Sequence, residues 1–132
     1  KLGKGRLISI ELDADGGGRA REHFGQAGLS SWVEVRTGDA RALVREIREE
    51  VDFLFLDCNY SNYEPCYAGI EGRLKDGALL VADNVGIGAV GMKDYLDRVR
   101  LRHESETEWF EIDLPWGKRD AMEVTIFRKA AR

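Results

Sequence analysis

Two apolar stretches decide the fold, VDFLFLD at residues 51–57 and GALLVAD at residues 77–83. Each is nearly continuously apolar, as a strand must be when both faces of its sheet are covered. Each also ends in an acidic residue, Asp57 or Asp83. A helical pattern from about residue 62 to 74 lies between them. Strand, helix and second strand together predict a parallel pair joined by a helical crossover.

The same alternation precedes this unit. The strands RLISIEL (6–12) and WVEVRTG (32–38) are separated by a helical pattern that Asp15 is placed to cap and that Gly28 ends. A further helical pattern over residues 40–50 leads into the first of the two apolar stretches. Five elements of alternating type indicate an α/β fold.

The C-terminal part follows a different pattern. After a short helical segment at 92–100, EWFEIDL (108–114) and AMEVTIF (121–127) alternate apolar and polar residues around PWGKRD (115–120). This pattern predicts a β-hairpin. We therefore expect a single α/β domain over residues 1–132, with a mostly parallel sheet closed by an antiparallel hairpin.

The hairpin also carries aromatic residues. Trp109 and Phe110 are adjacent on a strand, so their side chains point to opposite faces and we expect at least one in the core. Trp116, in the hairpin loop, has two interpretations, structural packing and a position over an aromatic acceptor.

Composition and charge exclude several classes of protein. The 132 residues are 43% hydrophobic and 33% charged, which is typical of a folded protein with a real core. A net charge of −4 argues against a nucleic-acid surface. Arg98, Arg100 and Arg102 have helical spacing, and we interpret them as a solvated helix face. No apolar run reaches the roughly 20 residues of a membrane span.

Cysteine and histidine usage narrows the chemistry. Cys58 and Cys66 are too few for a disulfide scaffold, so we expect a reducing, cytoplasmic environment. Cys58 has no partner base and is interpreted as a packing residue. His23 and His103 match no zinc-ligand spacing, and we expect both at the surface.

Four acidic residues follow strands at the carboxyl edge of the expected sheet. They are Glu11, Asp39, Asp57 and Asp83. Open α/β sheets bind ligands at this edge. Glu11 is placed to accept two hydrogen bonds from a ribose diol, while Asp57 and the pair Asp83–Asn84 offer two carboxylates and an amide oxygen. Such oxygen ligands suit a hard cation such as Mg²⁺. The alternative is that each acid caps a helix or begins a loop.

Three glycines follow this Asp–Asn pair. Gly86, Gly88 and Gly91 have the spacing G-x-G-x-x-G between a strand and a helix. In dinucleotide-binding proteins this spacing opens a parallel βαβ unit, whereas here the next strand belongs to a hairpin. We therefore favour the Asp–Asn pair, and not the glycines, as the functional element.

These stretches together resemble the S-adenosylmethionine-dependent O-methyltransferases of the catechol and caffeoyl-CoA O-methyltransferase type. The matching segments are GRLISIELD, AGLSSWVEVRTGDA, DFLFLDCNYSNY, GALLVADNV and DAMEVTIFRK, in the order and spacing of that family. The resemblance implies a Rossmann-like methyltransferase fold that binds S-adenosylmethionine, a divalent metal such as Mg²⁺ and a small catechol-like acceptor.

The resemblance also implies a role for each site residue. Glu11 would hold the cofactor ribose, Asp39 and Ala40 would border its adenine, and Asp57 and Cys58 would lie beside the cofactor. Asp57, Asp83 and Asn84 would bind the metal, which orients two vicinal oxygens of the acceptor. Asp57 and Tyr60 would be the catalytic residues.

Two departures from the family pattern matter. The family's glycine-rich first motif, on the first strand of its sheet, has no counterpart in this sequence, so we expect an N-terminally truncated domain. Because a missing strand leaves two strand edges unpaired, we expect a homodimer or a strand-swapped oligomer. Tyr60 stands where many relatives carry a lysine base. With a reference pKa of about 10, it could act as a base only if strongly perturbed, and the alternative is a wall against the acceptor.

Two other functions stay open. The chain could be a catalytically inactive methyltransferase-fold module for binding or assembly. It could also be a fragment of a dinucleotide-binding oxidoreductase that uses Gly86, Gly88 and Gly91.

Overall fold

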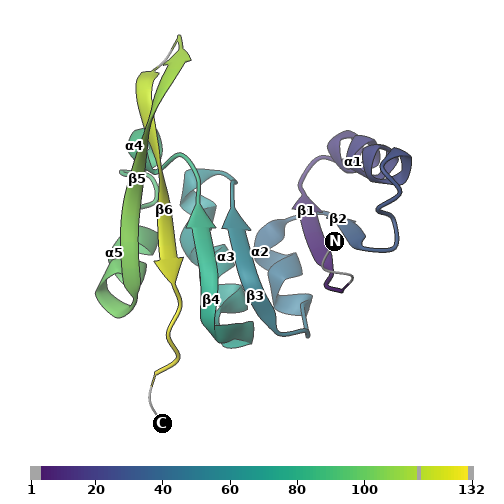
Figure 1. Ribbon diagram of the computed structural model, residues 1–132, viewed down its shortest axis with the longest axis horizontal. Coiled ribbons are helices and arrows are strands. Elements are labelled where there is room, and N and C mark those ends of the chain that lie inside the picture. Colours follow the sequence, from purple (N-terminus) through teal and green to yellow (C-terminus); the bar gives the residue numbers. More distant parts are fainter. Residues whose placement is uncertain (1–3, 116, 131–132) are drawn as a thin grey trace. The chain divides into compact units, whose positions relative to one another are not determined.

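The computed structural model describes residues 4–115 and 117–130, and the chain divides into two compact units, Lys1–Glu46 and Ile47–Arg132 (Figure 1). In chain order the elements are β1 (Leu7–Glu11), α1 (Ala14–Gln26), β2 (Val33–Thr37), α2 (Ala40–Leu43), η1 (Val44–Glu46), β3 (Val51–Leu56), η2 (Tyr60–Asn62), α3 (Tyr63–Ile70), η3 (Glu71–Arg73), β4 (Leu74–Ala82), α4 (Val85–Gly88), α5 (Lys93–Arg102), β5 (Glu104–Leu114) and β6 (Gly117–Ile126). The predicted α/β class is confirmed. No described helix is long and apolar enough to cross a membrane.

The first unit pairs β1 with β2 in parallel, with α1 as the connection. Asp13, and not the predicted Asp15, caps α1: its carboxylate accepts a hydrogen bond from the Gly16 amide at 2.7 Å. Asp13 has the extended backbone that an N-cap requires, whereas Asp15 already lies in the first turn. Gly28 follows the helix with a φ of +69°, a conformation that glycine adopts without strain.

The second unit contains a four-stranded sheet in the order β3-β4-β6-β5 (Figure 1). Strands β3 and β4 are parallel, with Leu56 opposite Ala82 at their carboxyl ends. Strand β6 runs antiparallel to both β4 and β5. The predicted hairpin is therefore confirmed. Within the described residues, β1 pairs only with β2 and β3 only with β4.

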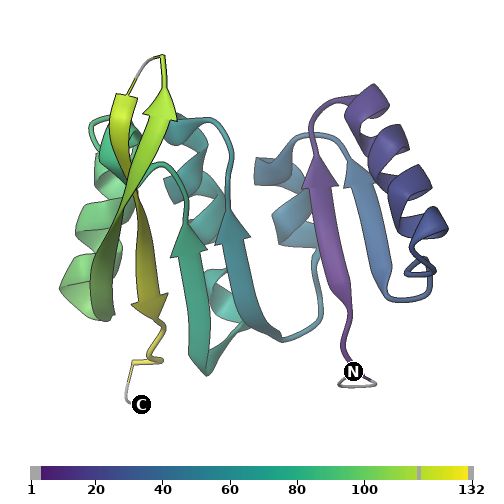
Figure 2. The ribbon, with the colours of Figure 1, turned by 45° about the horizontal axis from the view of Figure 1, so that its top comes forward.

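Helices α3 and α5 cover one face of this sheet (Figure 2). Their core contains three fully buried tyrosines, and the Tyr95 ring makes edge contacts with Tyr63 and Tyr67 at centroid distances of 5.8 and 5.6 Å. On the opposite face Phe53 and Phe55 are 51% and 49% exposed. The expectation that β3 is buried on both faces is wrong for this structure, because no described element shields the two phenylalanines.

The hairpin extends beyond the rest of its sheet. Strand β4 pairs with β6 only from Glu123 to Ile126, whereas the β5–β6 pairing continues outward past Trp109 and Phe110. Both aromatic residues are therefore exposed, at 51% and 42%, and the prediction that one lies in the core is wrong. The Trp109 ring packs instead under the Arg119 guanidinium. Trp116 lies outside the described residues.

Of the three α5 arginines expected on a solvated face, Arg100 and Arg102 are exposed, at 45% and 57%, whereas Arg98 is only 24% exposed. Arg98 forms ion pairs with Glu64 and Glu71 and lies 5.0 Å from the Tyr67 ring centroid. Arg100 forms a two-pronged pair with Glu123, with N–O distances of 2.7 and 2.8 Å. These contacts attach α5 to α3 and to β6.

His103, expected at the surface, is partly buried at the end of α5. Its Nδ1 accepts a hydrogen bond from the Arg128 amide, so its Nε2 carries the proton and donates it to the Tyr67 hydroxyl at 3.0 Å. Burial lowers the pKa of His103, which favours this neutral form.

The glycines of the turn after β4 allow neighbouring residues to pack closely against its backbone. A Cβ on Gly86 would lie 2.8 Å from the Ala121 backbone nitrogen, so only glycine lets α4 approach β6 this closely. Gly88 and Gly91 make room for Tyr60, because a Cβ on either would come within 2.8 Å of its side chain. All three positions of the G-x-G-x-x-G pattern are thus explained by contacts within the second unit.

The Arg100–Glu123 pair generates a stability prediction. Glu123 has only 1% of its side chain exposed, so Arg100→Met leaves a buried carboxylate without its cation and should lower the free energy of unfolding by about 3 kcal/mol. Urea denaturation measures the change. Lys93→Met, which removes an exposed ion pair with Asp97, is the control and should cost less than about 1 kcal/mol.

The same pair predicts a pH dependence. Burial raises the pKa of Glu123, but hydrogen bonds from Arg100 and Thr107 outweigh it and hold that pKa below its usual value. The stabilisation is therefore complete above the unfolded-state pKa of about 4.3 and is lost as the pH falls through the folded-state pKa. The stability gap between wild type and Arg100→Met should accordingly narrow below about pH 4; a constant gap from pH 7 to 3 would contradict this assignment.

The glycine turn generates a second prediction. Gly86→Ala should destabilise the protein by about 1–3 kcal/mol, because the added methyl group meets backbone atoms that cannot rotate away. Gly72→Ala is the matched control, since no atom lies within 4 Å of its added methyl group, and it should change stability by less than about 0.5 kcal/mol. Equal melting temperatures for the two variants would disprove the packing explanation.

Candidate functional site at the carboxyl ends of the strands

The second unit brings two predicted metal ligands side by side. Asp57 follows β3 and Asp83 follows β4, directly after the register pair Leu56 and Ala82. The Asp83 amide also donates a hydrogen bond to the Leu56 carbonyl at 2.9 Å. Neighbouring strands lie about 4.8 Å apart, so the two carboxylates start from adjacent backbone positions.

Several hydrogen bonds fix Asn84 in the turn after β4. Its φ of 55° is left-handed, a conformation that asparagine tolerates better than most residues. Its backbone amide donates to Asp83 Oδ1 at 2.8 Å, and its side-chain Nδ2 donates to Asp120 Oδ2 at 2.9 Å. The Tyr63 hydroxyl donates to the Asp83 carbonyl at 3.0 Å. The turn is thus fixed by contacts from α3 and from β6.

Asp120 is the residue that sequence reasoning missed. It was part of the predicted hairpin turn, yet it is buried at the start of the β6 segment that packs on α4. Burial raises the pKa of Asp120, but hydrogen bonds from Asn84 and from three backbone amides outweigh it, so the pKa is lowered overall. The signal in the sequence is an acidic residue immediately before an apolar strand, which is too common to identify a site.

The donor set suits a hard cation. Within the described part of the chain, the Asp57 carboxylate makes no hydrogen bond or ion pair, and no cation pairs with Asp83. Two carboxylates and an amide oxygen are ligands that Mg²⁺ accepts while it keeps part of its hydration. Among the described residues no three His, Cys, Asp or Glu side chains are grouped so that they could hold a metal.

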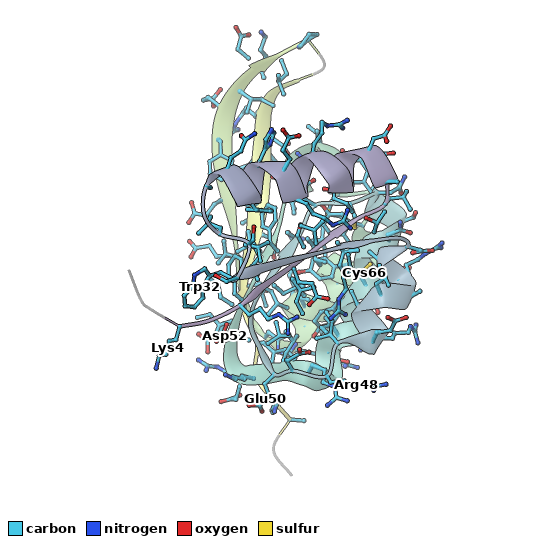
Figure 3. All side chains as sticks on the ribbon, turned by 90° about the vertical axis from the view of Figure 1, so that its right-hand side faces the viewer. Lys4, Trp32, Arg48, Glu50, Asp52 and Cys66 are labelled. Carbon is cyan, nitrogen blue, oxygen red and sulfur yellow. The ribbon has the colours of Figure 1, made fainter. Side chains whose placement is uncertain are left out.

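Tyr60 and Cys58 lie beside this edge, between β3 and α3. The Tyr60 ring packs on the Cα atoms of Gly88 and Gly91 and borders a shallow pocket of about 150 Å³. Cys66 lies on α3 (Figure 3), and its hydrogen bond with Cys58, together with burial, raises the pKa of the Cys58 thiol. No disulfide joins the two cysteines. A neutral, half-buried thiol agrees with a packing role and not with a nucleophile.

The first unit carries the predicted cofactor residues. Glu11 ends β1 with an exposed side chain, and its carbonyl accepts a hydrogen bond from the Gly38 amide at 2.9 Å. Asp39 caps α2, whose first residue is Ala40, and its carboxylate binds the Arg41 guanidinium at 2.6 Å. The hydrogen bonds from Arg41 lower the pKa of Asp39. Glu11, Asp39 and Ala40 thus meet at one edge of the β1–β2 pair.

Comparison with known proteins agrees with this arrangement. A family model described as O-methyltransferase matches residues 3–102. Catechol O-methyltransferase from Niastella koreensis is 34% identical over 85 residues, covering 61% of this chain and 38% of that protein. Catechol O-methyltransferase from Sus scrofa is 29% identical over 135 residues, covering 96% of this chain and 72% of that protein.

Solved structures show the same fold. The O-methyltransferase TomG from Streptomyces achromogenes, in complex with SAM, has a TM-score of 0.79 at 18% identity, over 95% of this chain and 63% of that one. The O-methyltransferase from Bacillus cereus, in complex with SAH, has a TM-score of 0.78 at 19% identity, over 93% of this chain and 63% of that one.

The family assignment rests on the sequence match. Residues 3–102 include every strand end discussed above, from Glu11 to Asn84, and they make up well over half of the 132-residue chain. The chain also spans only part of the length of its relatives, 38% of the Niastella koreensis protein and 63% of each solved structure named above. This chain belongs to the O-methyltransferase family.

Proposed function

We propose that this chain forms part of an S-adenosylmethionine-dependent enzyme that methylates a hydroxyl oxygen of a small catechol-like acceptor with the help of a divalent metal. The observation that carries the proposal is the edge formed by Asp57, Asp83 and Asn84, where two adjacent carboxylates lack a cationic partner among the described residues. Family membership and the catechol O-methyltransferase relatives support the reaction class.

Each residue has a defined task in this proposal. Asp57, Asp83 and Asn84 hold the metal, whose charge favours the ionised form of a nearby acceptor hydroxyl. Glu11 accepts hydrogen bonds from the cofactor ribose. Asp39 and Ala40 border the adenine of the cofactor. Such a transfer depends mainly on holding the acceptor oxygen in line with the sulfonium methyl group.

Tyr60 completes the acceptor side. Its ring is wedged against Gly88 and Gly91, and this contact fixes the plane of the phenol. A fixed ring favours a role as a wall against a flat acceptor. A role as the base that replaces the lysine of many relatives would require a perturbed phenol.

Two cysteines that form no disulfide with each other support a cytoplasmic location for the proposed enzyme.

The metal assignment can be tested by calorimetric titration with S-adenosylhomocysteine and Mg²⁺. Asp83→Ala should abolish Mg²⁺ binding and Mg²⁺-dependent methyl transfer, while affinity for S-adenosylhomocysteine changes less than about threefold, because Asp83 serves the metal and not the cofactor. Asp52→Ala is the matched control. It removes a carboxylate from the opposite end of β3, one that is 81% exposed, and should leave both affinities unchanged.

The same titrations separate the other two functions. Equal methyl transfer in chelator and in Mg²⁺ would overturn the metal role. A folded protein that binds neither S-adenosylhomocysteine nor Mg²⁺ would be a binding or assembly module with the methyltransferase fold. Binding of a nicotinamide dinucleotide in preference to S-adenosylhomocysteine would favour the oxidoreductase. The three glycines that such an enzyme would use to bind the dinucleotide pack closely against Tyr60 and β6.

We further propose that the chain self-associates through β3. Among the described residues this strand pairs only with β4, and it exposes Phe53 and Phe55 beside the partly exposed Leu79. An unpaired apolar strand edge is a template for pairing with a second chain. A homodimer or a strand exchange would bury this surface.

Light scattering at working concentration tests this association. The wild-type chain should have at least twice the 14.9 kDa monomer mass, and Phe55→Glu should shift it towards the monomer by placing a charge on the apolar face. Leu101→Glu is the control, because Leu101 is exposed on α5, away from the β3 edge. A monomeric wild type would exclude the dimer.

A further inference from the structure

Asp120 is a buried carboxylate whose hydrogen-bond partners all belong to one turn or to its own strand. Its Oδ2 accepts from the Asn84 side chain at 2.9 Å, and its Oδ1 accepts from the Ile87 amide at 3.1 Å and the Ala121 amide at 2.8 Å. No lysine, arginine or histidine of the described residues pairs with it. The charge is therefore stabilised by N–H groups alone.

This contact determines which way the Asn84 amide points. An ionised carboxylate can only accept hydrogen bonds, so the NH₂ group of Asn84 has to face Asp120. The amide is planar with its oxygen and nitrogen on opposite sides, so Asn84 Oδ1 points away from Asp120. This oxygen is the one atom of the side chain that can bind a cation, and it takes no part in the contact with Asp120.

We propose that Asp120 is a positioning residue that presents the Asn84 amide oxygen to the divalent cation. The inference rests on the proposed function, because it concerns the same metal site. The proposed metal site then depends on Asp120 of β6 as well as on the ligands that follow β3 and β4. Hydrogen-bond partners that orient metal ligands in this way commonly change metal affinity about 10- to 100-fold when they are replaced.

A purely structural role would have a different signature. Asp120 also holds α4 against β6 through Ile87, so removing the whole side chain would loosen the turn and lower stability. The informative variant therefore keeps the shape and the backbone hydrogen bonds and changes only the group that faces Asn84.

Asp120→Asn is that variant. The new amide can keep its oxygen on the Ile87 and Ala121 amides, but it turns an NH₂ group towards Asn84. Two facing NH₂ groups cannot bond, so Asn84 has to flip and give its oxygen to position 120. Mn²⁺ affinity, measured from the EPR signal of the free ion with Mg²⁺ as competitor, should fall about 10- to 100-fold. The melting temperature of the metal-free protein should change little.

Exchanging the two groups should restore binding. In the double variant Asn84→Asp with Asp120→Asn, the new amide donates to one carboxylate oxygen at position 84 and leaves the other for the cation. Aspartate also tolerates the left-handed backbone there. The double variant should recover Mn²⁺ affinity to within about threefold of wild type. Asp113→Asn, which removes one charge from an exposed hairpin residue, controls for net charge and should have no effect.

The outcomes distinguish the inference from the function on which it rests. Wild-type affinity in Asp120→Asn would overturn the positioning role and leave the metal site intact. A loss in Asp120→Asn that the double variant does not repair would overturn it too, since the amide orientation would not be the cause. A wild-type chain that binds no Mn²⁺ would overturn the positioning role together with the metal assignment.

Discussion

The pairing of β4 on both of its sides is the constraint on which the candidate site depends. On one side the parallel register with β3 places Leu56 opposite Ala82, which makes Asp57 and Asp83 neighbours. On the other side the antiparallel β6 continues past the end of β4 and brings Asp120 to the turn that begins at Asn84. Backbone hydrogen bonds of one strand thus assemble three elements whose sequence positions span more than sixty residues.

Sequence reasoning succeeded where the information is local. The apolar runs identified β3 and β4, and acids directly after them had to meet at the carboxyl edge, because parallel strands end on the same side. It failed for Asp120. The sequence of a predicted hairpin does not indicate which strand of the sheet the hairpin will pair with. The contact between Asp120 and Asn84 depends on that pairing, so no short stretch of sequence could predict it.

Two patterns in the sequence can each have more than one physical cause. The spacing of Gly86, Gly88 and Gly91 is shared with nucleotide-binding loops, yet here each glycine makes room for a neighbouring residue. Arg98 has the helical spacing typical of a solvated face, but it is partly buried and pairs with Glu64 on α3. In both cases the pattern was real, and its cause lay in tertiary contacts that periodicity cannot distinguish.

The acidic residues of the second unit have different partners in different places. Between the helices and the sheet of the second unit, Glu64 and Glu71 share an ion pair with Arg98, and the buried Glu123 pairs with Arg100. Arg102 also lies 3.7 Å from Glu71. At the carboxyl edge the described residues leave Asp83 and Asp120 with N–H donors only, and Asp57 without a partner. The acids that pack against the helices therefore have arginine partners, whereas the acids at the strand ends have none among the described residues.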